Sequence, residues 1–103
     1  MEHEIQNEIR AALANDCMIF RANVGRMKTP DGRYFSTGLP VGFPDLFGFR
    51  KSDGRAVFIE VKTVSGRASK AQQHFLETVR KYGAIAGICR SPEDAMKLIK
   101  EEI

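Results

Sequence analysis

Three charged residues stand in the most apolar, strand-like part of the sequence. Asp45 follows Pro44 near the start of one apolar run, and Glu60 and Lys62 close the next run. Charged groups are costly to bury and seldom lie unpaired in such segments. Two carboxylates beside a lysine suit a divalent-metal site that acts on phosphate esters, because Mg²⁺ binds carboxylate oxygens and shares its other positions with water and phosphate.

These charges meet if the two runs form a β-hairpin. Residues 43–50 and 56–62 are separated by a short segment that contains Asp-Gly, a strong hairpin signal between apolar runs. The turn sets Asp45 near Glu60, and the alternation of side chains along a strand puts Lys62 on the same face as Glu60. The lysine could then orient or deprotonate an attacking water, or stabilise developing negative charge. The alternative is a salt-bridge cluster on a half-exposed sheet, but the register and the basic surroundings favour the metal site.

Periodicity and capping signals predict the elements on either side of this hairpin. Ser69 and Gln72 have the spacing of a capping box, Gly83 is placed to end the same helix, and Ser91 with Pro92 begins another. A hairpin followed by a helical crossover predicts a mixed sheet with helices on its faces, in an α/β fold of order αβββαβα. The predicted elements are a helix over 2–16, a strand over about 17–24, a long loop over 25–41, strands over 43–50 and 56–62, a helix over 69–83, a strand over 84–90 and a helix over 91–103.

Length and composition set the class of protein. The chain has 103 residues, 43% of them apolar, which predicts a single domain over 1–103. No apolar run reaches 18 residues and the first ten residues are charged, so we expect no membrane span, no signal peptide and a cytoplasmic location. Cys17 and Cys89 both fall in apolar runs and are predicted to be buried free thiols.

The charge is concentrated in one part of the chain. Residues 21–70 carry ten Lys or Arg against four acids, whereas the whole chain has a net charge of +3. A focused positive field favours a polyanionic partner, most simply nucleic acid. A solvated basic surface is the alternative.

The pattern of residues resembles a known family of nucleases. Pro44-Asp45, a gap of fourteen residues and Glu60-Val61-Lys62 resemble the PD-(D/E)xK signature. The segments "EIQ", "FRANVG", "GLPVGFPDLFGF", "IEVKT", "GRASKAQQHFLE" and "GAIAGICRSPEDA" extend the resemblance over nearly the whole chain, to the stand-alone phage and bacterial form of the virus-type replication-repair nuclease (VRR-NUC) domain. This resemblance implies a restriction-endonuclease-like core and a Mg²⁺- or Mn²⁺-dependent endonuclease in a bacterial or phage-infected cell. It further implies a homodimer that acts on branched DNA such as Holliday junctions or flaps.

The resemblance also implies roles for individual residues. Asp45 and Glu60 would bind the metal, with the Val61 carbonyl as a further ligand, and Lys62 would be the catalytic lysine. Gln72 matches a glutamine that lies near the site in many members of the family. Its capping-box role is an alternative that is compatible with the first.

The family also places a glutamate on the first helix, and here three residues compete. At about 100° per residue, Glu2 falls on the apolar stripe of that helix, whereas Glu4 and Glu8 fall off that side. A glutamate that reaches the sheet must lie on the inward face, so we favour Glu2 and then Glu8. The alternative is that all three are solvated and stabilise the helix N-terminus electrostatically.

Residues that contact DNA are predicted from charge and position. A helix N-terminus with basic neighbours is a good phosphate site, and no base-reading motif is visible, so we expect contacts to the DNA backbone. The candidates are Arg21, Arg26, Lys28, Arg33, Arg67, Ser69 and Lys70, with Tyr34 beside them.

Two functions other than a nuclease stay open. One is a non-catalytic nucleic-acid-binding module, and the other is an accessory subunit that cuts only with a replication or repair protein as partner.

Overall fold

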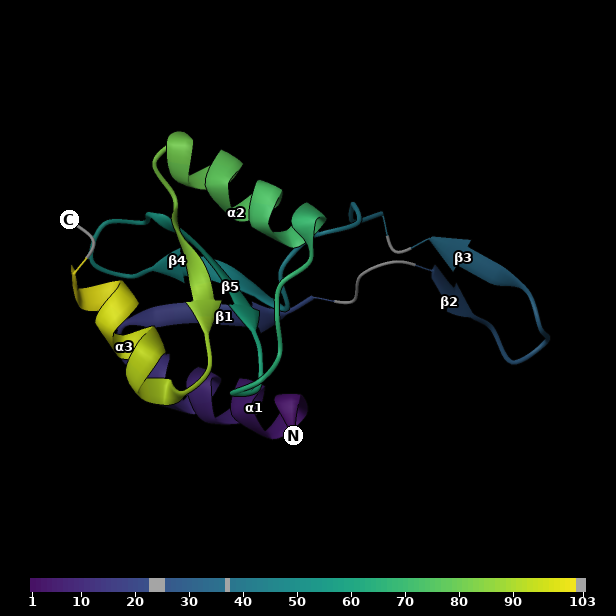
Figure 1. Ribbon diagram of the computed structural model, residues 1–103, viewed down its shortest axis with the longest axis horizontal. Helices are drawn as coiled ribbons and strands as arrows, with labels where there is room; N and C mark the ends of the chain where they lie inside the picture. Colours follow the sequence, from purple (N-terminus) through teal and green to yellow (C-terminus); the bar gives the residue numbers. More distant parts are fainter. Residues whose placement is uncertain (23–25, 37, 102–103) are drawn as a thin grey trace.

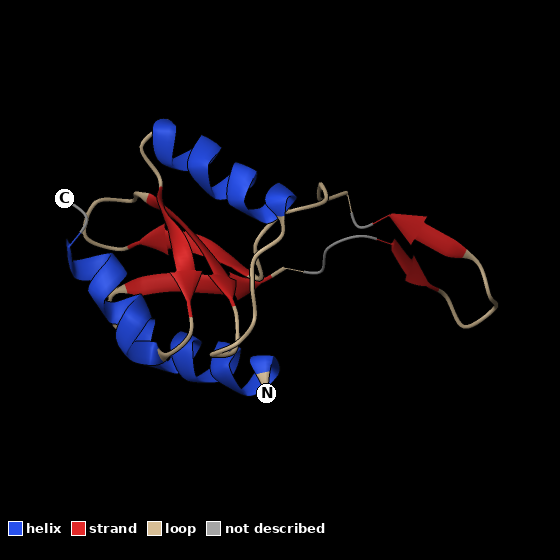
Figure 2. Ribbon diagram, viewed as in Figure 1, coloured by secondary structure: helices blue, strands red, loops and turns tan. Residues whose placement is uncertain are grey.

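The computed structural model describes residues 1–22, 26–36 and 38–101. A four-stranded sheet forms the centre of the body, with α2 on one face and α1 and α3 on the other (Figures 1 and 2). The elements are α1 (Glu2–Leu13), β1 (Cys17–Arg21), β2 (Arg26–Lys28), β3 (Tyr34–Ser36), β4 (Leu46–Arg50), β5 (Ala56–Val61), α2 (Lys70–Lys81), β6 (Ile85–Cys89) and α3 (Pro92–Glu101).

The sheet is mixed, as the sequence predicted. Its strand order is β1-β4-β5-β6, and β4 pairs antiparallel with both β1 and β5, whereas β5 and β6 run parallel. The turn at Gly54, where φ is +72°, closes the β4–β5 hairpin. Leu46 pairs with Ile59 and Phe49 with Ala56, which confirms the predicted register. Helix α2 makes the crossover between the two parallel strands.

The two faces of the sheet are packed differently. Side chains of β1, β4, β5 and β6 form the main core with Ile9 and Leu13 of α1 and Ala95 and Ile99 of α3. The α2 face is aromatic instead. On this face the Phe43 ring makes edge-to-face contacts with the rings of Phe47, Phe58 and Phe75. Helix α2 leaves the β1 side of this face open, and the side chains of Met18, Phe20 and Phe49 are 42%, 46% and 40% exposed there.

The long loop predicted over 25–41 contains a second, two-stranded sheet. Strands β2 and β3 pair antiparallel with Lys28 opposite Tyr34, and the Thr29 amide donates to the Arg33 carbonyl across the turn at Gly32. The prediction of a plain loop was wrong because each strand has three residues, too few to show a period among the turn-forming residues. Figure 1 shows this hairpin extending from the body at the end where α1 and α2 begin.

The capping signals agree with the observed helix ends. The Ser69 hydroxyl accepts from the Gln72 amide and the Gln72 side chain accepts from the Ser69 amide, so the predicted capping box is present. Gly83 follows α2 with φ of +100°, and the Ser91 hydroxyl accepts from the Asp94 amide at the start of α3. These local signals fix where the helices begin and end.

Two further expectations concern the cysteines and the membrane. Cys17 and Cys89 are free and buried, and burial raises the pKa of the Cys89 thiol to about 12. None of the helices in the described part of the chain is long and apolar enough to cross a bilayer. The predicted strand over about 17–24 ends at Arg21, and residues 23–25 lie outside the described part.

Candidate active site

Asp45 and Glu60 face each other at the open end of the β4–β5 hairpin. Asp45 directly precedes Leu46, and Glu60 directly follows the Ile59 that pairs with Leu46. An Asp45 carboxylate oxygen accepts from the Val61 amide at 2.9 Å, which ties the acid to the neighbouring strand. The Glu60 side chain is 2% exposed and lies on the α2 face, opposite the core. The register therefore brings the two carboxylates together, as predicted.

The Glu60 carboxylate has two donors and one buried oxygen that lacks a donor. Its Oε2 accepts a hydrogen bond from the side-chain amide nitrogen of Gln72 at 3.1 Å and lies 3.3 Å from the Lys62 ammonium. Its Oε1 is buried and receives no hydrogen bond from the part of the chain that the structure describes. A carboxylate oxygen in this state needs a proton or a cation.

The electrostatics of Glu60 agree with that need. Burial is the main cause that raises the pKa of Glu60 to about 7, and repulsion by the nearby Asp45 carboxylate contributes. The positive charge of Lys62 and its hydrogen bond to Glu60 lower this pKa, but by less than burial and Asp45 raise it. A divalent cation would neutralise both carboxylates and occupy the unsatisfied oxygen, so these residues fit such an ion.

Neighbouring elements hold the segments that carry these side chains. Gly42, with φ of +92°, lies so close to α2 that an added Cβ would stand 2.6 Å from the Ala71 carbonyl oxygen. This contact fixes the chain just before Asp45 against the first turn of α2. On the other side, the Arg90 guanidinium donates to the carbonyls of Thr63 and Gly66 at 2.5 and 2.6 Å and so holds the loop that follows Lys62.

Comparison with known proteins identifies the family and the fold of this chain. A family model described as the VRR-NUC domain matches residues 6–93. The chain belongs to the VRR-NUC domain family. A solved structure titled "VRR_NUC domain" matches with a TM-score of 0.67 and 23% identity, over 99% of this chain and 97% of that one, which shows a shared fold. The comparison with curated proteins finds no match.

Membership in this family makes the chain a nuclease-type domain. The family is generally dependent on divalent metals, and DNA is the substrate that a nuclease domain implies. The predicted fold class and the predicted family are both confirmed. Asp45, Glu60, Lys62 and Gln72 all lie within the matched residues 6–93, whereas Glu2 lies before them.

Among the described residues, no third acidic side chain joins Asp45 and Glu60 in a group that could hold a metal. In residues 1–22, 26–36 and 38–101, no group of three His, Cys, Asp or Glu side chains is placed to hold a metal. Glu2 is partly exposed at the first position of α1, and Glu4 and Glu8 are exposed. The role of Glu2 therefore stays a prediction.

One polar residue of α1 was not predicted to matter. Gln6 is only 9% exposed, and its side-chain oxygen is buried without a hydrogen-bond partner in the described part of the chain. Its position at the edge of the apolar stripe was a signal of burial. Nothing in the sequence, however, distinguished a buried amide from a polar side chain at a solvated boundary.

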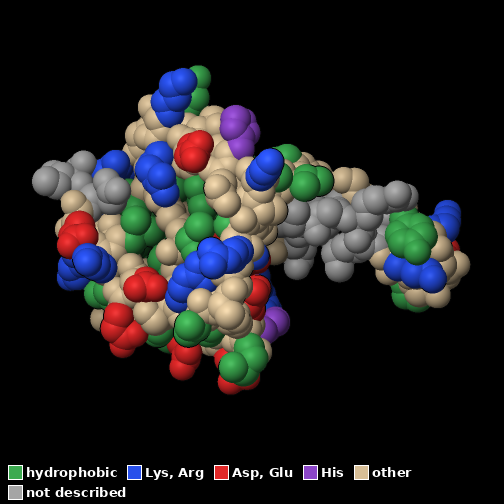
Figure 3. All heavy atoms as spheres, in the orientation of Figure 1, with side chains coloured by type: hydrophobic (Ala, Val, Ile, Leu, Met, Phe, Trp, Pro, Cys, Tyr) green, Lys and Arg blue, Asp and Glu red, His purple; other side chains and the backbone are tan. Residues whose placement is uncertain are grey.

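The residues predicted to contact DNA lie on several exposed segments. Arg21 ends β1 beside His3, Lys28 lies 5.9 Å from the centre of the Tyr34 ring, and Arg33 pairs with Asp31 at 2.9 Å. Arg67 and Lys70 flank Ser69, whose hydroxyl serves the capping box, and Arg26 begins β2 with its side chain outside the described part. Figure 3 shows Lys and Arg side chains on the body and on the hairpin.

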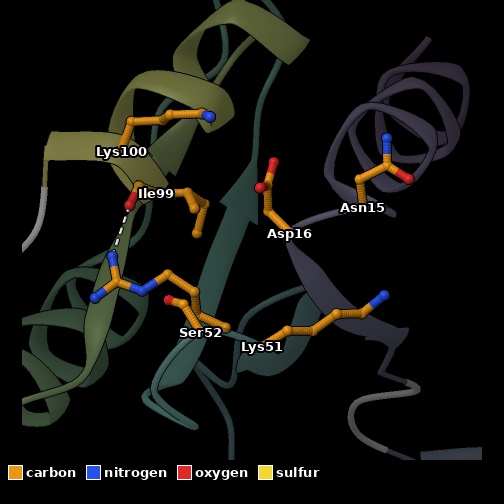
Figure 4. A pocket seen from close by; sticks show the side chains of 7 residues that line it. Asn15, Asp16, Lys51, Ser52, Ile99 and Lys100 are labelled. Carbon is orange, nitrogen blue, oxygen red and sulfur yellow. Dashed lines mark hydrogen bonds between the residues drawn. The ribbon is translucent and has the colours of Figure 1, made fainter.

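A separate cavity of about 310 Å³ lies at the opposite end of β4 from Asp45 (Figure 4). Two of its cationic side chains already have structural partners. Arg50 donates to the Ile99 carbonyl at 2.7 Å, and the Lys51 ammonium donates to the Ala14 carbonyl at 3.0 Å. The cavity therefore belongs to the packing of the β4–β5 turn rather than to the acid pair. Its lining residues are Asn15, Asp16, Arg50, Lys51, Ser52, Ile99 and Lys100.

Proposed function

We propose that this VRR-NUC domain is a Mg²⁺- or Mn²⁺-dependent endonuclease that hydrolyses phosphodiester bonds in DNA. One observation carries the proposal. The buried Glu60 carboxylate lies against Asp45 and 3.3 Å from the Lys62 ammonium, while its Oε1 lacks a donor in the described residues. A structural salt bridge would pair its charges fully, whereas this group of side chains has an excess of negative charge that suits a cation.

Asp45 and Glu60 would hold the ion, with the Val61 carbonyl as a further ligand. When bound, the ion supplies charge that neutralises the phosphodiester and acidifies the attacking water. The backbone amide of Val61 donates to one Asp45 oxygen at 2.9 Å, and the side-chain amide of Gln72 donates to one Glu60 oxygen at 3.1 Å. Both carboxylates are therefore oriented before the substrate arrives, which is what a preorganised site requires.

Lys62 would act on the substrate. Its side chain is 14% exposed, so the ammonium lies between the buried Glu60 and the surface. From there it can orient the attacking water or stabilise the charge that develops on the phosphoryl oxygens. Gln72 supports the site through Glu60.

The DNA would be bound mainly through its phosphates. The basic segments and the N-terminus of α2 provide donors for the backbone, and the absence of a base-reading motif in the sequence favours selection by DNA structure. We propose that the substrate is branched DNA in replication, repair or recombination, and that a homodimer presents two sites to two strands of a junction. The phosphate contacts assigned to this role are Arg21, Arg26, Lys28, Arg33, Arg67, Ser69 and Lys70.

The test is cleavage by the purified chain alone. A four-way junction, a flap, a splayed duplex and a plain duplex are incubated with Mg²⁺ or Mn²⁺, using wild type, Lys62→Ala and the control Lys81→Ala, which alters an exposed lysine at the end of α2. We expect wild type and Lys81→Ala to cut branched DNA and Lys62→Ala to cut about 10²- to 10⁴-fold more slowly. Equal cutting by Lys62→Ala, or none by wild type, would overturn the proposal.

A further inference from the structure

An exposed aromatic ring lies one row away from the acid pair. The Ala22 amide donates to the Asp45 carbonyl at 2.8 Å, so the pairing of β1 with β4 continues up to the site. The next pair on the same face is Phe20 with Phe47. Phe20 is 46% exposed although it is a large apolar side chain. A ligand that reaches Asp45 over this face therefore passes over the Phe20 ring.

The Phe20 ring is supported from below by other rings. Its centroid lies 5.9 Å from that of Phe47, and Phe47 lies 5.5 Å from Phe43, which packs against Phe75 of α2 at 5.1 Å. One side of the Phe20 ring is held by this chain of contacts while the rest is open. A ring held in this way loses little conformational freedom when a flat ligand stacks on it.

The position of the ring favours DNA as the ligand. DNA must approach Asp45 and Glu60 to be cut, and Phe20 lies on the next row of the same sheet face. The Lys62 ammonium, 3.3 Å from Glu60, supplies positive charge on this same face. Bases within a paired duplex are stacked on each other, whereas an unpaired base at a branch point exposes its face to an aromatic side chain.

We infer that Phe20 is a base-stacking residue that takes the face of an unpaired DNA base beside the phosphate held at Asp45 and Glu60. The inference rests on the proposed nuclease function and adds the feature of the substrate that the site selects. It assigns selectivity for branched DNA to one side chain in addition to the basic surface. A second copy of the chain on the same face is the competing occupant, and the experiment separates the two.

The first measurement uses fluorescence. The chain contains no tryptophan, so Phe20→Trp introduces a single reporter. The matched control is Phe49→Trp, at a position on the same face with 40% exposure but two rows from Asp45. Both are made with Lys62→Ala to prevent cutting, and are titrated with a flap that carries unpaired thymines and with a plain duplex. We expect the flap to quench the fluorescence of the Phe20→Trp variant and to leave that of the Phe49→Trp variant unchanged, and the duplex to quench neither.

The second measurement separates stacking from subunit contact. Phe20→Ala and Phe20→Leu are expected to bind the flap roughly tenfold more weakly than wild type, with Phe20→Tyr retaining affinity because it keeps the ring. Duplex binding and the sedimentation coefficient should stay unchanged in all three. Equal quenching of the Phe20→Trp and Phe49→Trp variants by the flap would overturn the inference. It would also be overturned if Phe20→Ala sedimented as a smaller species and bound every DNA substrate more weakly than wild type. Binding is read without cleavage, so a failure of the nuclease proposal remains a separate result.

Discussion

The two ends of the β4–β5 hairpin shift the pKa of an acidic residue in opposite directions. At the turn, Asp53 accepts from the Arg50 guanidinium at 3.1 and 2.6 Å. Those hydrogen bonds lower the pKa of Asp53 to about 2. At the open end, burial and the Asp45 carboxylate raise the pKa of Glu60 to about 7. One hairpin therefore holds an acid that favours the charged form and another that resists it.

The difference lies in how the charges are matched. The Asp53 carboxylate has a guanidinium of its own, so its negative charge is balanced where the chain turns. At the open end, Asp45 and Glu60 are near a single Lys62 ammonium, and one oxygen of Glu60 lacks a donor in the described residues. A pair that is matched within the fold stabilises the fold, whereas an unmatched buried acid signals a ligand that the protein is built to bind.

The largest effect should come from neutralising one acid at each end. Glu60→Gln keeps the size of the side chain but removes a proposed ligand, so we expect cleavage of branched DNA to fall by about 10³-fold or more, the scale of losing a principal catalytic group. Asp53→Asn removes the exposed pair with Arg50 and should leave cleavage unchanged, with a small decrease in melting temperature. The measurement is the single-turnover rate with Mg²⁺. Equal losses in the two variants would show that the contrast between the ends has no functional meaning.

Metal binding should be visible without any DNA. A ligand that binds only the folded state at about 100 times its Kd stabilises that state by about 2.7 kcal/mol. We expect Mg²⁺ or Mn²⁺ to raise the melting temperature of wild type and of Asp53→Asn by several degrees, and to leave Glu60→Gln unchanged. Differential scanning fluorimetry over a series of metal concentrations measures the shift. A shift of wild-type size in Glu60→Gln would place the ion away from the acid pair.

The pH dependence of stability should also have opposite signs at the two ends. Because the pKa of Glu60 rises from 4.5 to about 7 on folding, its contribution without metal is fully present below 4.5 and is lost as the pH rises toward 7. The pKa of Asp53 falls from 3.8 to about 2, so its contribution is present above 3.8 and is lost as the pH falls through 2. Urea unfolding with a chelator at about pH 4 to 8 should show a decline that Glu60→Gln removes. A decline of the same size in Glu60→Gln would assign it to other groups.

The sequence predicted the hairpin because its signals are local. Asp-Gly at the turn and the alternation of apolar residues set the register, and the register alone places Asp45 opposite Glu60. The β2–β3 hairpin has the same Asp-Gly dipeptide at its turn, Asp31-Gly32, but its strands are three residues long and too short to show the alternation of apolar residues. The pairing of such short strands depends on contacts between them, and three residues are too few for a hydrophobic period to reveal it.

The site was predicted less completely than the fold. An E-x-K pattern identifies Glu60 and Lys62, but the donor that orients Glu60 comes from another element, Gln72 of α2. Capping chemistry explains Gln72 from its neighbours in sequence, whereas its bond to Glu60 depends on how α2 packs on the sheet. The buried amide of Gln6 was missed for the same reason, because burial at the edge of a helical stripe depends on tertiary packing.

The smallest predicted effect separates the two roles of Gln72. Gln72→Glu keeps a capping-box acceptor at the same helix position but replaces the donor to Glu60 with a second negative charge, so cleavage should fall by about tenfold or more and the like charges should lower the stability at neutral pH. Ser69→Ala removes the cap and leaves the bond to Glu60, so it should destabilise the protein by about 1 kcal/mol with cleavage retained. Melting temperature and cleavage rate are measured on the same samples. If Gln72→Glu cuts as fast as wild type, then Gln72 acts only as a cap, and the open end of the hairpin orients its acids through the Val61 amide alone.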